Sequence, residues 1–437
     1  MLNVRRFACL MMLGAVSICA SRCGKSSEDP AASSPSTPTK AEAVSITLYT
    51  DSVGKHFDIS KQLAADFEKE SGVHVNIHEA PQSTTESLAE VQKFLSAKSA
   101  DFDVVVIDVV WPGLLKDHLI DLTGVVDTKD FFPAMIENNT ISGKLLAIPF
   151  YSDAGILYYR TDLLKEYGFA AAPKTWDELE KMAHTIMDGE RKKGNDRFFG
   201  ITFQGAAYEG LTCDTVEWAA SAGAKWTIDE KGNVSLGGEK LAKALDRRRG
   251  WIGTIAPQGV LSGKEEDARL LFQGGNAAFM RNWPYCYQLG QTGDSAVKGK
   301  FDVAPLPADE SGESAACLGG WNVAVTKYSK HPEEAKKFAA FLTTRDAMKK
   351  RAIEGSYFST RPDIYADPEV AKAIPFLGQM KDVLLHAVPR PASAAGSRYN
   401  MVSSIYYQMS HDVLSGSKPA AEAVAEAEKA MQQALAR

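Results

Sequence analysis

The chain has 437 residues, of which 45% are hydrophobic and 24% are charged, and its formal net charge at pH 7 is −6. This length exceeds what one compact core needs and fits two domains of ordinary size with room for a tail. The balance of residue types is that of a globular protein, and the negative charge provides no basic surface for a polyanion. We therefore expect no nucleic-acid partner.

The six cysteines are divided between the N-terminus and the body of the chain. Three fall within the first two dozen residues: Cys9, Cys19 and Cys23. The others are spread through the body without metal-type spacing: Cys213, Cys286 and Cys317. We predict no metal site and no cofactor. If Cys23 carries a lipid, the three body thiols allow at most one disulfide, and the sequence leaves the pairing open.

The first 22 residues have the features of a secretory signal. Arg5 and Arg6 precede an apolar run over residues 7–20. This run is too short to cross a bilayer as a stable helix but suits the core of a signal peptide. We therefore expect residues 1–22 to be a signal peptide and the mature protein to be periplasmic or otherwise extracytoplasmic.

Two cleavage sites fit this signal: an ordinary peptidase site near Ala20, or a site just before Cys23 followed by lipid attachment to its thiol. The second agrees better with residues 23–43, whose Gly, Ser, Pro, Thr, Ala and charged residues predict a flexible tether. Arg22 departs from the usual bacterial lipobox, which has Gly or Ala there. We predict lipidation at Cys23, with the membrane contacted only through this anchor.

The body of the chain has an α/β pattern. Residues 45–49 alternate like a strand, and the apolar positions that follow recur every four residues until Gly72 stops the helix. A second strand is predicted over 73–77 and an amphipathic helix around 87–95. Residues 104–107 form an unbroken apolar run, typical of a strand covered on both faces. These elements predict a parallel sheet with crossover helices.

Two further helices carry clear signals. Thr175 and Glu178 have the spacing of a capping box, and Leu179, Met182 and Ile186 form the apolar stripe behind it. The last helix begins after Pro419 and is expected to bury four residues: Ala423, Val424, Ala427 and Met431. No internal repeat and no Gly-rich phosphate loop is visible in the sequence.

Four segments place aromatic and polar residues near the ends of predicted elements. In the first, the apolar strand ends in Asp108, with Trp111 and Pro112 close behind. Ligands of open α/β sheets bind at such carboxyl ends. The alternative is that Asp108 caps the next helix and Trp111 fills the core.

The second segment carries Tyr151 and Asp153, which face the same side of an extended stretch because they are two residues apart. Tyr151 would lie against a sugar ring while Asp153 accepts hydroxyl hydrogen bonds. The alternative places Tyr151 in a contact between lobes. The third segment repeats this spacing with Trp283 and Tyr285.

The fourth segment is Gly319-Gly320-Trp321, whose glycines let the backbone approach a ligand or bend as a hinge. Aromatic faces suit pyranose rings, because the axial C–H groups form an apolar patch while the hydroxyls need carboxylates, amides and Arg around the rim. A single Trp is more often a core residue. The four segments together nevertheless favour a sugar site.

Six segments together resemble family 1 of the extracellular solute-binding proteins of ABC importers, in that family's order and across nearly the whole mature chain. They are FEKESG at 67–72, the segment 103–113, GKLLAIPFYSDAGILYYRTDLL, PKTWDEL, AAFMRNWPY and GGWNVAV. Within this family, IDVVWPG, FQGAAYEGLTC and RNWPY are most similar to the trehalose- and maltose-binding branch.

The resemblance implies a two-lobed, periplasmic-binding-protein-like α/β fold with a ligand cleft between lobes that close like a jaw. The expected lobes are 44–151 with 320–370, and 152–319 with 371–437. The three crossings between them are expected near 149–154, 315–321 and 368–374.

The resemblance also implies a function: binding of a glucose-containing disaccharide of the trehalose or maltose type, and its delivery to the permease subunits of an ABC transporter, by a protein that acts as a monomer. The ligand-binding residues it nominates are Asp108, Tyr151, Asp153, Trp283, Tyr285, Gly320, Trp321 and Arg390. Tyr208 and Glu209 match the pattern less closely. The loop 50–55 is expected to border the cleft without an assigned role.

Two other classes of function fit parts of this pattern. An exported glycoside hydrolase needs a carboxylate pair roughly 5–10 Å apart, but no such pair stands in a catalytic motif, and no nucleophile elbow is present. His74 and His78 are expected on the solvent face of a strand instead of at a metal. A polyamine receptor would use Asp108 and Asp153 in an aromatic cage, which Arg281 and Arg390 would oppose if both faced the cleft. We therefore expect a receptor without enzymatic activity.

Overall fold

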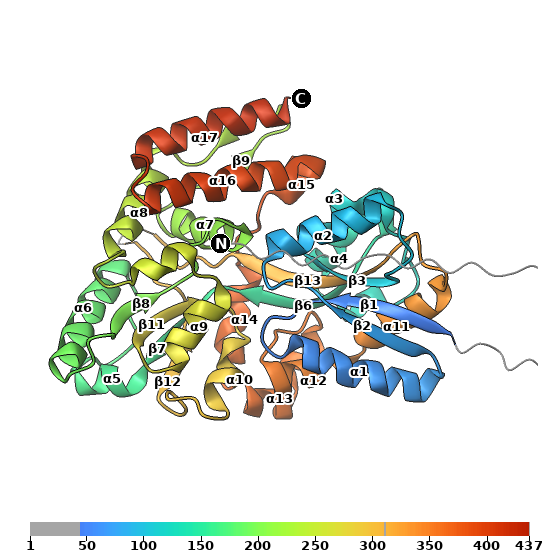
Figure 1. The fold of residues 1–437 in the computed structure, drawn as a ribbon, viewed down its shortest axis with the longest axis horizontal. Helices are drawn as coiled ribbons and strands as arrows, with labels where there is room; N and C mark the ends of the chain where they lie inside the picture. Colours follow the sequence, from blue (N-terminus) through green and yellow to red (C-terminus); the bar gives the residue numbers. More distant parts are fainter. Residues whose placement is uncertain (1–43, 310–311, 437) are drawn as a thin grey trace, which may run out of the picture. The chain divides into compact units, whose positions relative to one another are not determined.

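Two β-sheets organise residues 44–309 and 312–436, the part of the chain that the structure, a computed structural model, describes (Figure 1). The five-stranded sheet has the order β2 (His74–Glu79), β1 (Ser45–Thr50), β3 (Val104–Asp108), β13 (Leu318–Val325), β6 (Ile148–Ala154). The first three strands are parallel, and β13 is antiparallel to both of its neighbours. The four-stranded sheet has the order β12 (Phe301–Ala304), β7 (Ile156–Arg160), β11 (Ala277–Asn282), β8 (Phe199–Thr202).

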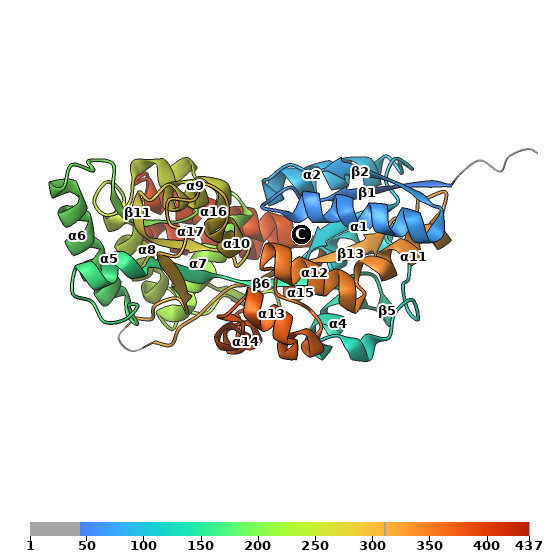
Figure 2. The same cartoon turned by 90° about the horizontal axis from the view of Figure 1, so that it is seen from below.

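Helices cover both sheets, and two short hairpins, β4–β5 (Thr140–Ile141, Lys144–Leu145) and β9–β10 (Thr227–Ile228, Val234–Ser235), complete the strands. Around the first sheet lie α1 (His56–Ser71), α2 (Thr84–Ser96), α3 (Pro112–Leu115), α4 (Pro133–Asn139), α11 (Pro332–Leu342), α12 (Arg345–Gly355), α13 (Pro368–Ala373) and α14 (Leu377–Leu385). With the second sheet lie α5 (Thr161–Glu166), α6 (Trp176–Lys192), α7 (Glu209–Ser221), α8 (Glu239–Trp251), α9 (Glu265–Gln273), α15 (Ala392–Ala395), α16 (Tyr399–Leu414) and α17 (Ala420–Leu435). Helix α10 (Cys286–Gln291) contacts both α12 and Phe301 in β12. Figure 2 shows α5 and α6 at one end of the molecule and α1 and α11 near the other.

The predicted secondary structure is confirmed where its signals were strongest. Every residue of β3 is buried, as expected for an apolar strand between two neighbours. Helix α1 ends at Gly72, whose positive φ of 74° lets its N–H bond back to the carbonyl of Glu68. Thr175 and Glu178 form the predicted capping box, with Thr175 Oγ1 accepting from the Glu178 N–H at 3.2 Å. His74 and His78 lie exposed on β2, as expected.

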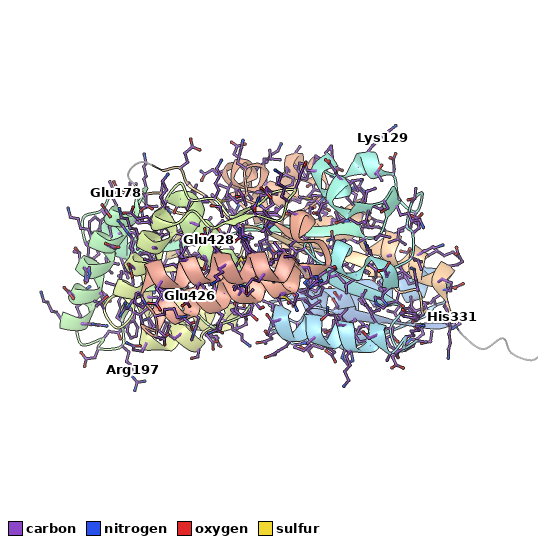
Figure 3. The ribbon with its side chains drawn as sticks, turned by 90° about the horizontal axis from the view of Figure 1, so that it is seen from above. Lys129, Glu178, Arg197, His331, Glu426 and Glu428 are labelled. Atoms are coloured by element: carbon purple, nitrogen blue, oxygen red, sulfur yellow. The ribbon has the colours of Figure 1, made fainter. Side chains whose placement is uncertain are left out.

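Some expectations concern the ends and the surface of the chain. The predicted signal peptide, the tether over 23–43 and the lipidation of Cys23 lie outside the described residues. Within the described part, no helix is long and apolar enough to span a membrane, and no cluster of three metal-ligating side chains occurs. Charged side chains cover the surface, and Lys129 and Arg197 extend outward at the edges of Figure 3.

The exact lobe boundaries remain a prediction, although the contacts favour a later position for the last crossing than 368–374. Helices α13 and α14 contact α12 and β6, which belong with the first sheet, whereas α16 contacts α7 and α8. Between them, Val388 pairs with Cys317 beside the start of β13. We propose that the third crossing lies near Val388.

Only one residue, Gly155, separates β6 in the first sheet from β7 in the second. A Cβ at Gly155 would lie 1.9 Å from Glu217 Oε1, so the lack of a side chain lets α7 approach this crossing. Gly320 in β13 has a φ of 126°, and a Cβ there would lie 2.6 Å from the carbonyl oxygen of Tyr151. Both positions therefore depend on glycine.

Gly320→Ala is expected to lower the free energy of unfolding by about 1–3 kcal/mol, because alanine would adopt a disfavoured φ and crowd β6. Gly378→Ala is the matched control, since Gly378 lies in α14 with open space around its Cα. Thermal unfolding measures both. Equal melting temperatures for the two variants would contradict the strain argument.

Candidate functional site

A cavity lies at the carboxyl ends of β1 and β3, between these strands and the N-terminus of α7. Nine of the ten predicted site residues line it: Asp108, Tyr151, Asp153, Glu209, Trp283, Tyr285, Gly320, Trp321 and Arg390. The tenth, Tyr208, stands behind the wall, where its hydroxyl donates to Glu265 Oε2 at 2.6 Å. The structure therefore brings together residues that are separated by up to 282 positions in sequence.

Gly319 of the fourth segment also lines the cavity, together with residues that the sequence did not nominate as ligand contacts: Asp51, Val53, Gln82, Thr84, Gly210, Cys213, Glu265 and Tyr357. Asp51 and Val53 belong to the loop after β1, which was expected to border the cleft without a role. Glu265 is the first residue of α9, where an acidic residue is ordinarily explained by the helix dipole. Asp51 stands two residues after Tyr49, the spacing that singled out Tyr151 and Asp153, but Tyr49 is buried in the core and does not line the cavity.

Two indole rings from different sheets face the cavity. Trp283 follows β11, with the guanidinium of Arg281 4.0 Å from its ring centroid and its Nε1–H 3.4 Å from Glu265 Oε1. Trp321 in β13 packs edge-on against Trp111, with centroids 5.7 Å apart. Trp283 and Trp321 are both half-buried, whereas Trp111 is fully buried. Of the two interpretations of Trp111, the core residue is the correct one.

Two carboxyl groups in the cavity have little to neutralise them. Burial raises the pKa of Asp51 to about 7, although its carboxylate accepts from the Val53 N–H at 3.0 Å and the Tyr151 hydroxyl at 3.2 Å. Burial, with the nearby charge of Asp51, also raises the pKa of Asp153 well above its usual range. The Oδ1 atom of Asp153 has no hydrogen-bond partner among the described residues. It is a buried acceptor at the cavity wall.

Arg390 joins the two sides of the cavity. Its guanidinium donates to Asp108 Oδ1 at 2.7 Å, at the end of β3, and to Glu209 Oε1 at 2.7 Å, at the start of α7. Glu209 also accepts from Ser403 Oγ at 2.6 Å and from the Tyr399 hydroxyl. Burial raises the pKa of Glu209 despite the nearby Arg390. The charge of Arg390 is therefore compensated by carboxylates from both lobes.

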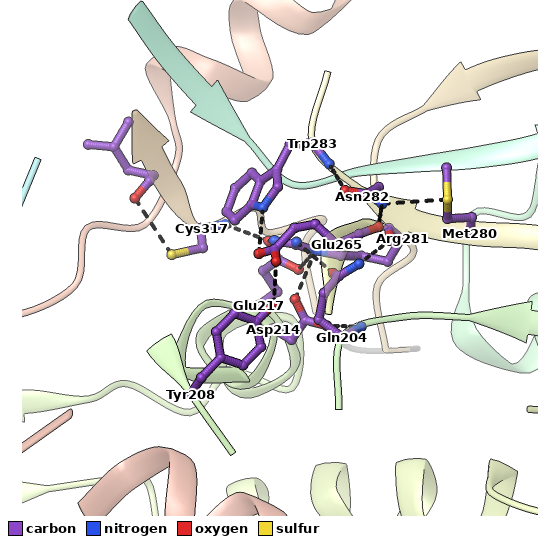
Figure 4. Close-up of polar contacts among 11 residues, drawn as sticks. Gln204, Tyr208, Asp214, Glu217, Glu265, Met280, Arg281, Asn282, Trp283 and Cys317 are labelled. Carbon is purple, nitrogen blue, oxygen red and sulfur yellow. Dashed lines mark hydrogen bonds and ion pairs between the residues drawn. The ribbon is translucent and has the colours of Figure 1, made fainter. Parts of the chain in front are cut away.

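Arg281 lies behind Trp283 in a second buried ion cluster (Figure 4). It pairs with Glu217 at 2.5 and 2.8 Å and with Asp214 at 3.1 Å. Glu217 Oε1 also accepts from the backbone N–H of Cys317 at 3.1 Å. Because Glu217 contacts Gly155 as well, one carboxylate touches the first and second crossings between the sheets. Arg281 therefore does not present an unpaired charge to the cavity, and the expected repulsion of a cation does not arise.

Asp51→Asn is expected to change how stability depends on pH. The pKa of Asp51 is about 7 in the folded state and 3.8 ordinarily, so the folded state binds the proton more tightly than the unfolded state does. Protonation of Asp51 therefore stabilises the fold below pH 4, and this stability is lost as the pH rises through 7. At pH 8 the free energy of unfolding of the variant should therefore exceed that of the parent by about 2–4 kcal/mol, and its melting temperature should be higher. Near pH 4 the two proteins should have the same stability. Thermal unfolding across this range measures the effect. Asp117→Asn, at an exposed carboxylate, is the control, and parallel curves for parent and Asp51→Asn would refute the argument.

Comparison with known proteins agrees with this architecture. Residues 51–349 match the family model described as bacterial extracellular solute-binding protein. A probable ABC transporter-binding protein of Deinococcus radiodurans is 47% identical over 379 residues, covering 86% of this chain and 90% of that protein. The mannitol-binding protein of Pseudomonas aeruginosa is 26% identical over 271 residues, which is 60% of this chain and 58% of that protein.

Among solved structures, the maltose-bound MalE3 of T. maritima superimposes with a TM-score of 0.85 at 36% sequence identity, covering 90% of this chain and all of that one. This likeness confirms the two-lobed α/β fold expected from the sequence. The structural likeness and the family match, which extends over most of the chain, together assign the transport role of the protein. The chain belongs to the bacterial extracellular solute-binding proteins and is the non-enzymatic substrate-binding component of an ABC transporter.

Proposed function

We propose that the protein binds a glucose-containing disaccharide of the maltose or trehalose type in the cavity between its lobes. The main support is that the indole rings of Trp283 and Trp321 share one cavity with Asp153, whose buried Oδ1 has no hydrogen-bond partner among the described residues. The chain is also 36% identical to a maltose-bound structure. Pyranose rings need this combination, because their C–H faces are apolar and their hydroxyls require acceptors.

The cavity residues divide this task by chemistry. Trp283 and Trp321 offer faces for the sugar rings. Asp51 and Asp153 accept hydroxyl hydrogen bonds, and each bond formed offsets the cost of burying a carboxylate. Arg390 orients Asp108 and Glu209 around the ligand. Each of these groups binds or orients the sugar, and none is assigned a chemical step.

Contacts between α2 of one lobe and residues of the other lobe bridge the cavity, as expected for a closed form of the receptor. The Thr85 hydroxyl oxygen, on α2, accepts from the backbone N–H of Glu209 at 3.1 Å, and Lys264 lies 3.5 Å from Glu86. Entry of a disaccharide requires these contacts to separate, by rotation of the lobes about the three crossings. The permease subunits would favour the open form, and the monomeric receptor would thereby release the sugar to them.

An amine-bearing ligand such as a polyamine is the second candidate. The carboxylates of Asp51, Asp153 and Glu265 have no ion-pair partner among the described residues, while Arg281 and Arg390 are both compensated. A bound cation would favour the ionised form of these carboxyl groups, whose pKa values burial raises in Asp51 and Asp153, and it would meet aromatic faces in the same cavity. The comparison with a maltose-bound structure favours the sugar.

A thermal-shift screen separates the two candidates. At a concentration one hundred times its dissociation constant, a ligand adds about 2.7 kcal/mol to the free energy of unfolding. We expect maltose or trehalose to raise the melting temperature more than sucrose, monosaccharides, mannitol or polyamines do. A response to polyamines alone would replace the sugar with the second candidate.

Calorimetric titration with the best sugar then tests individual residues. Trp283→Ala should cost about 1–4 kcal/mol of binding because a ring face is lost. Asp153→Asn, which keeps the size and removes the charged acceptor, should cost about 1.5–3 kcal/mol. Trp226→Ala is the aromatic control, since Trp226 stacks on Tyr406 outside the cavity, and Asp302→Asn is the exposed carboxylate control. Unchanged affinity in the first two variants, with a lower melting temperature, would mean that these residues only pack.

We also propose that a lipid on Cys23 anchors the protein, through the tether over residues 23–43, beside its transporter. Cys23→Ser should move the mature protein from the membrane fraction to the soluble fraction, because no second membrane attachment is expected. Fractionation followed by immunoblotting measures this. Continued sedimentation of the variant with membranes would exclude Cys23 as the anchor.

A further inference from the structure

Two of the three body cysteines meet where α7 approaches the second crossing. Cys213 and Glu217 are four residues apart on α7 and so share one face of the helix. Glu217 bonds to the backbone N–H of Cys317 at 3.1 Å, which brings this face of α7 against the residue preceding β13. Both side chains belong to one hydrophobic cluster, and the Cys317 thiol is close enough to Cys213 to raise the pKa of that thiol. Both are buried and reduced in this structure.

The third thiol lies apart from this pair. Cys286 begins α10, where its neighbours include Tyr285, Glu266 and Arg269. Cys213 and Cys317 belong to one hydrophobic cluster, and Cys286 belongs to another. The sequence left the choice of pair open, whereas in the structure Cys213 and Cys317 share one cluster where α7 approaches the second crossing, and Cys286 lies in the other cluster.

We propose that Cys213 and Cys317 form a disulfide when the protein folds outside the cytoplasm, tying α7 to the second crossing. A thiolate of the pair attacks the disulfide of an extracytoplasmic thiol–disulfide oxidant and forms a mixed disulfide. The second thiol, as its thiolate, displaces the oxidant's sulfur. The pair loses two protons and two electrons, and the oxidant leaves as a dithiol.

The bond should form before the lobes are fully packed. In the folded chain Cys317 is fully buried and Cys213 is almost fully buried, so a bulky oxidant cannot reach either thiol. The neighbouring Cys317 thiol and the burial of the side chain both raise the pKa of Cys213, so little reactive thiolate is present. A protein that folds reduced should therefore oxidise slowly, and one that folds in the presence of an oxidant should contain the bond.

The bond would restrain the wall of the sugar cavity. Cys213 lies on α7 and lines the cavity. On the other side of the bond, Cys317 is separated by two residues of β13 from Gly320, which also lines the cavity. The backbone at Cys317 must also adjust when the lobes separate. A covalent link there closes a loop of roughly 100 residues, a length at which cross-links strongly restrict the unfolded chain. The disulfide would therefore add stability and keep α7 in register with β13.

Alkylation of the exported protein under denaturing conditions, before and after reduction, tests the pairing. Peptide mapping should find Cys213 and Cys317 linked and unlabelled before reduction, with Cys286 already labelled. The peptides identify each cysteine, so the state of Cys23 does not affect the result. Labelling of both Cys213 and Cys317 before reduction, even after refolding with oxidised glutathione, would overturn the proposal, as would a link to Cys286.

Melting temperatures provide the second test. The oxidised protein should melt about 5 °C above its reduced form. Cys317→Ser should abolish this difference, while Cys286→Ser, the control at the other buried thiol, should keep it. If the difference persists in Cys317→Ser, the stabilising bond is not the one proposed.

Discussion

The ion pair between Arg281 and Glu217 is the interaction on which the site depends. Glu217 holds the guanidinium of Arg281 against the ring of Trp283. The same carboxylate accepts from the backbone N–H of Cys317 at the second crossing and lies against Gly155 at the first crossing. Buried ion pairs gain little stability over apolar packing, but loss of one partner leaves a costly unpaired charge. The pair therefore fixes the orientation of one aromatic wall relative to the strands that connect the sheets.

A second set of charges acts between the lobes instead of within one. Arg390 lies two residues after Val388, where we propose the third crossing, and it binds one carboxylate from each side of the cavity. In the open form that we propose, water would reach these groups and would compensate in part for the hydrogen bonds that are lost. Such a balance allows two conformations of similar free energy, which a receptor needs if it is to bind and then release its ligand.

The sequence predicted local features well and pairings across the chain poorly. The strands at 45–50 and 104–108, the capping box at Thr175 and the aromatic wall at Trp283 all carry signals within a few residues. By contrast, Glu217 and Arg281 are 64 residues apart, and nothing in either segment indicates the partner. Trp111 follows β3, and Trp321 lies in β13 opposite Asp108, the last residue of β3. Only the packing of the two indole rings decides that the first fills the core while the second faces the cavity.

The position of Trp283 gives the protein a built-in optical reporter. Its ring lies on Arg281 and its Nε1–H points to Glu265, both from its own lobe, while its edge reaches Gly319 on β13 of the other sheet. In the rotation of the lobes that we propose, the first two contacts would move with the ring and the third would be lost to water. Indole emission responds to such a change in polarity, so the intrinsic fluorescence of the unmodified protein should follow opening and closing in real time without an attached dye.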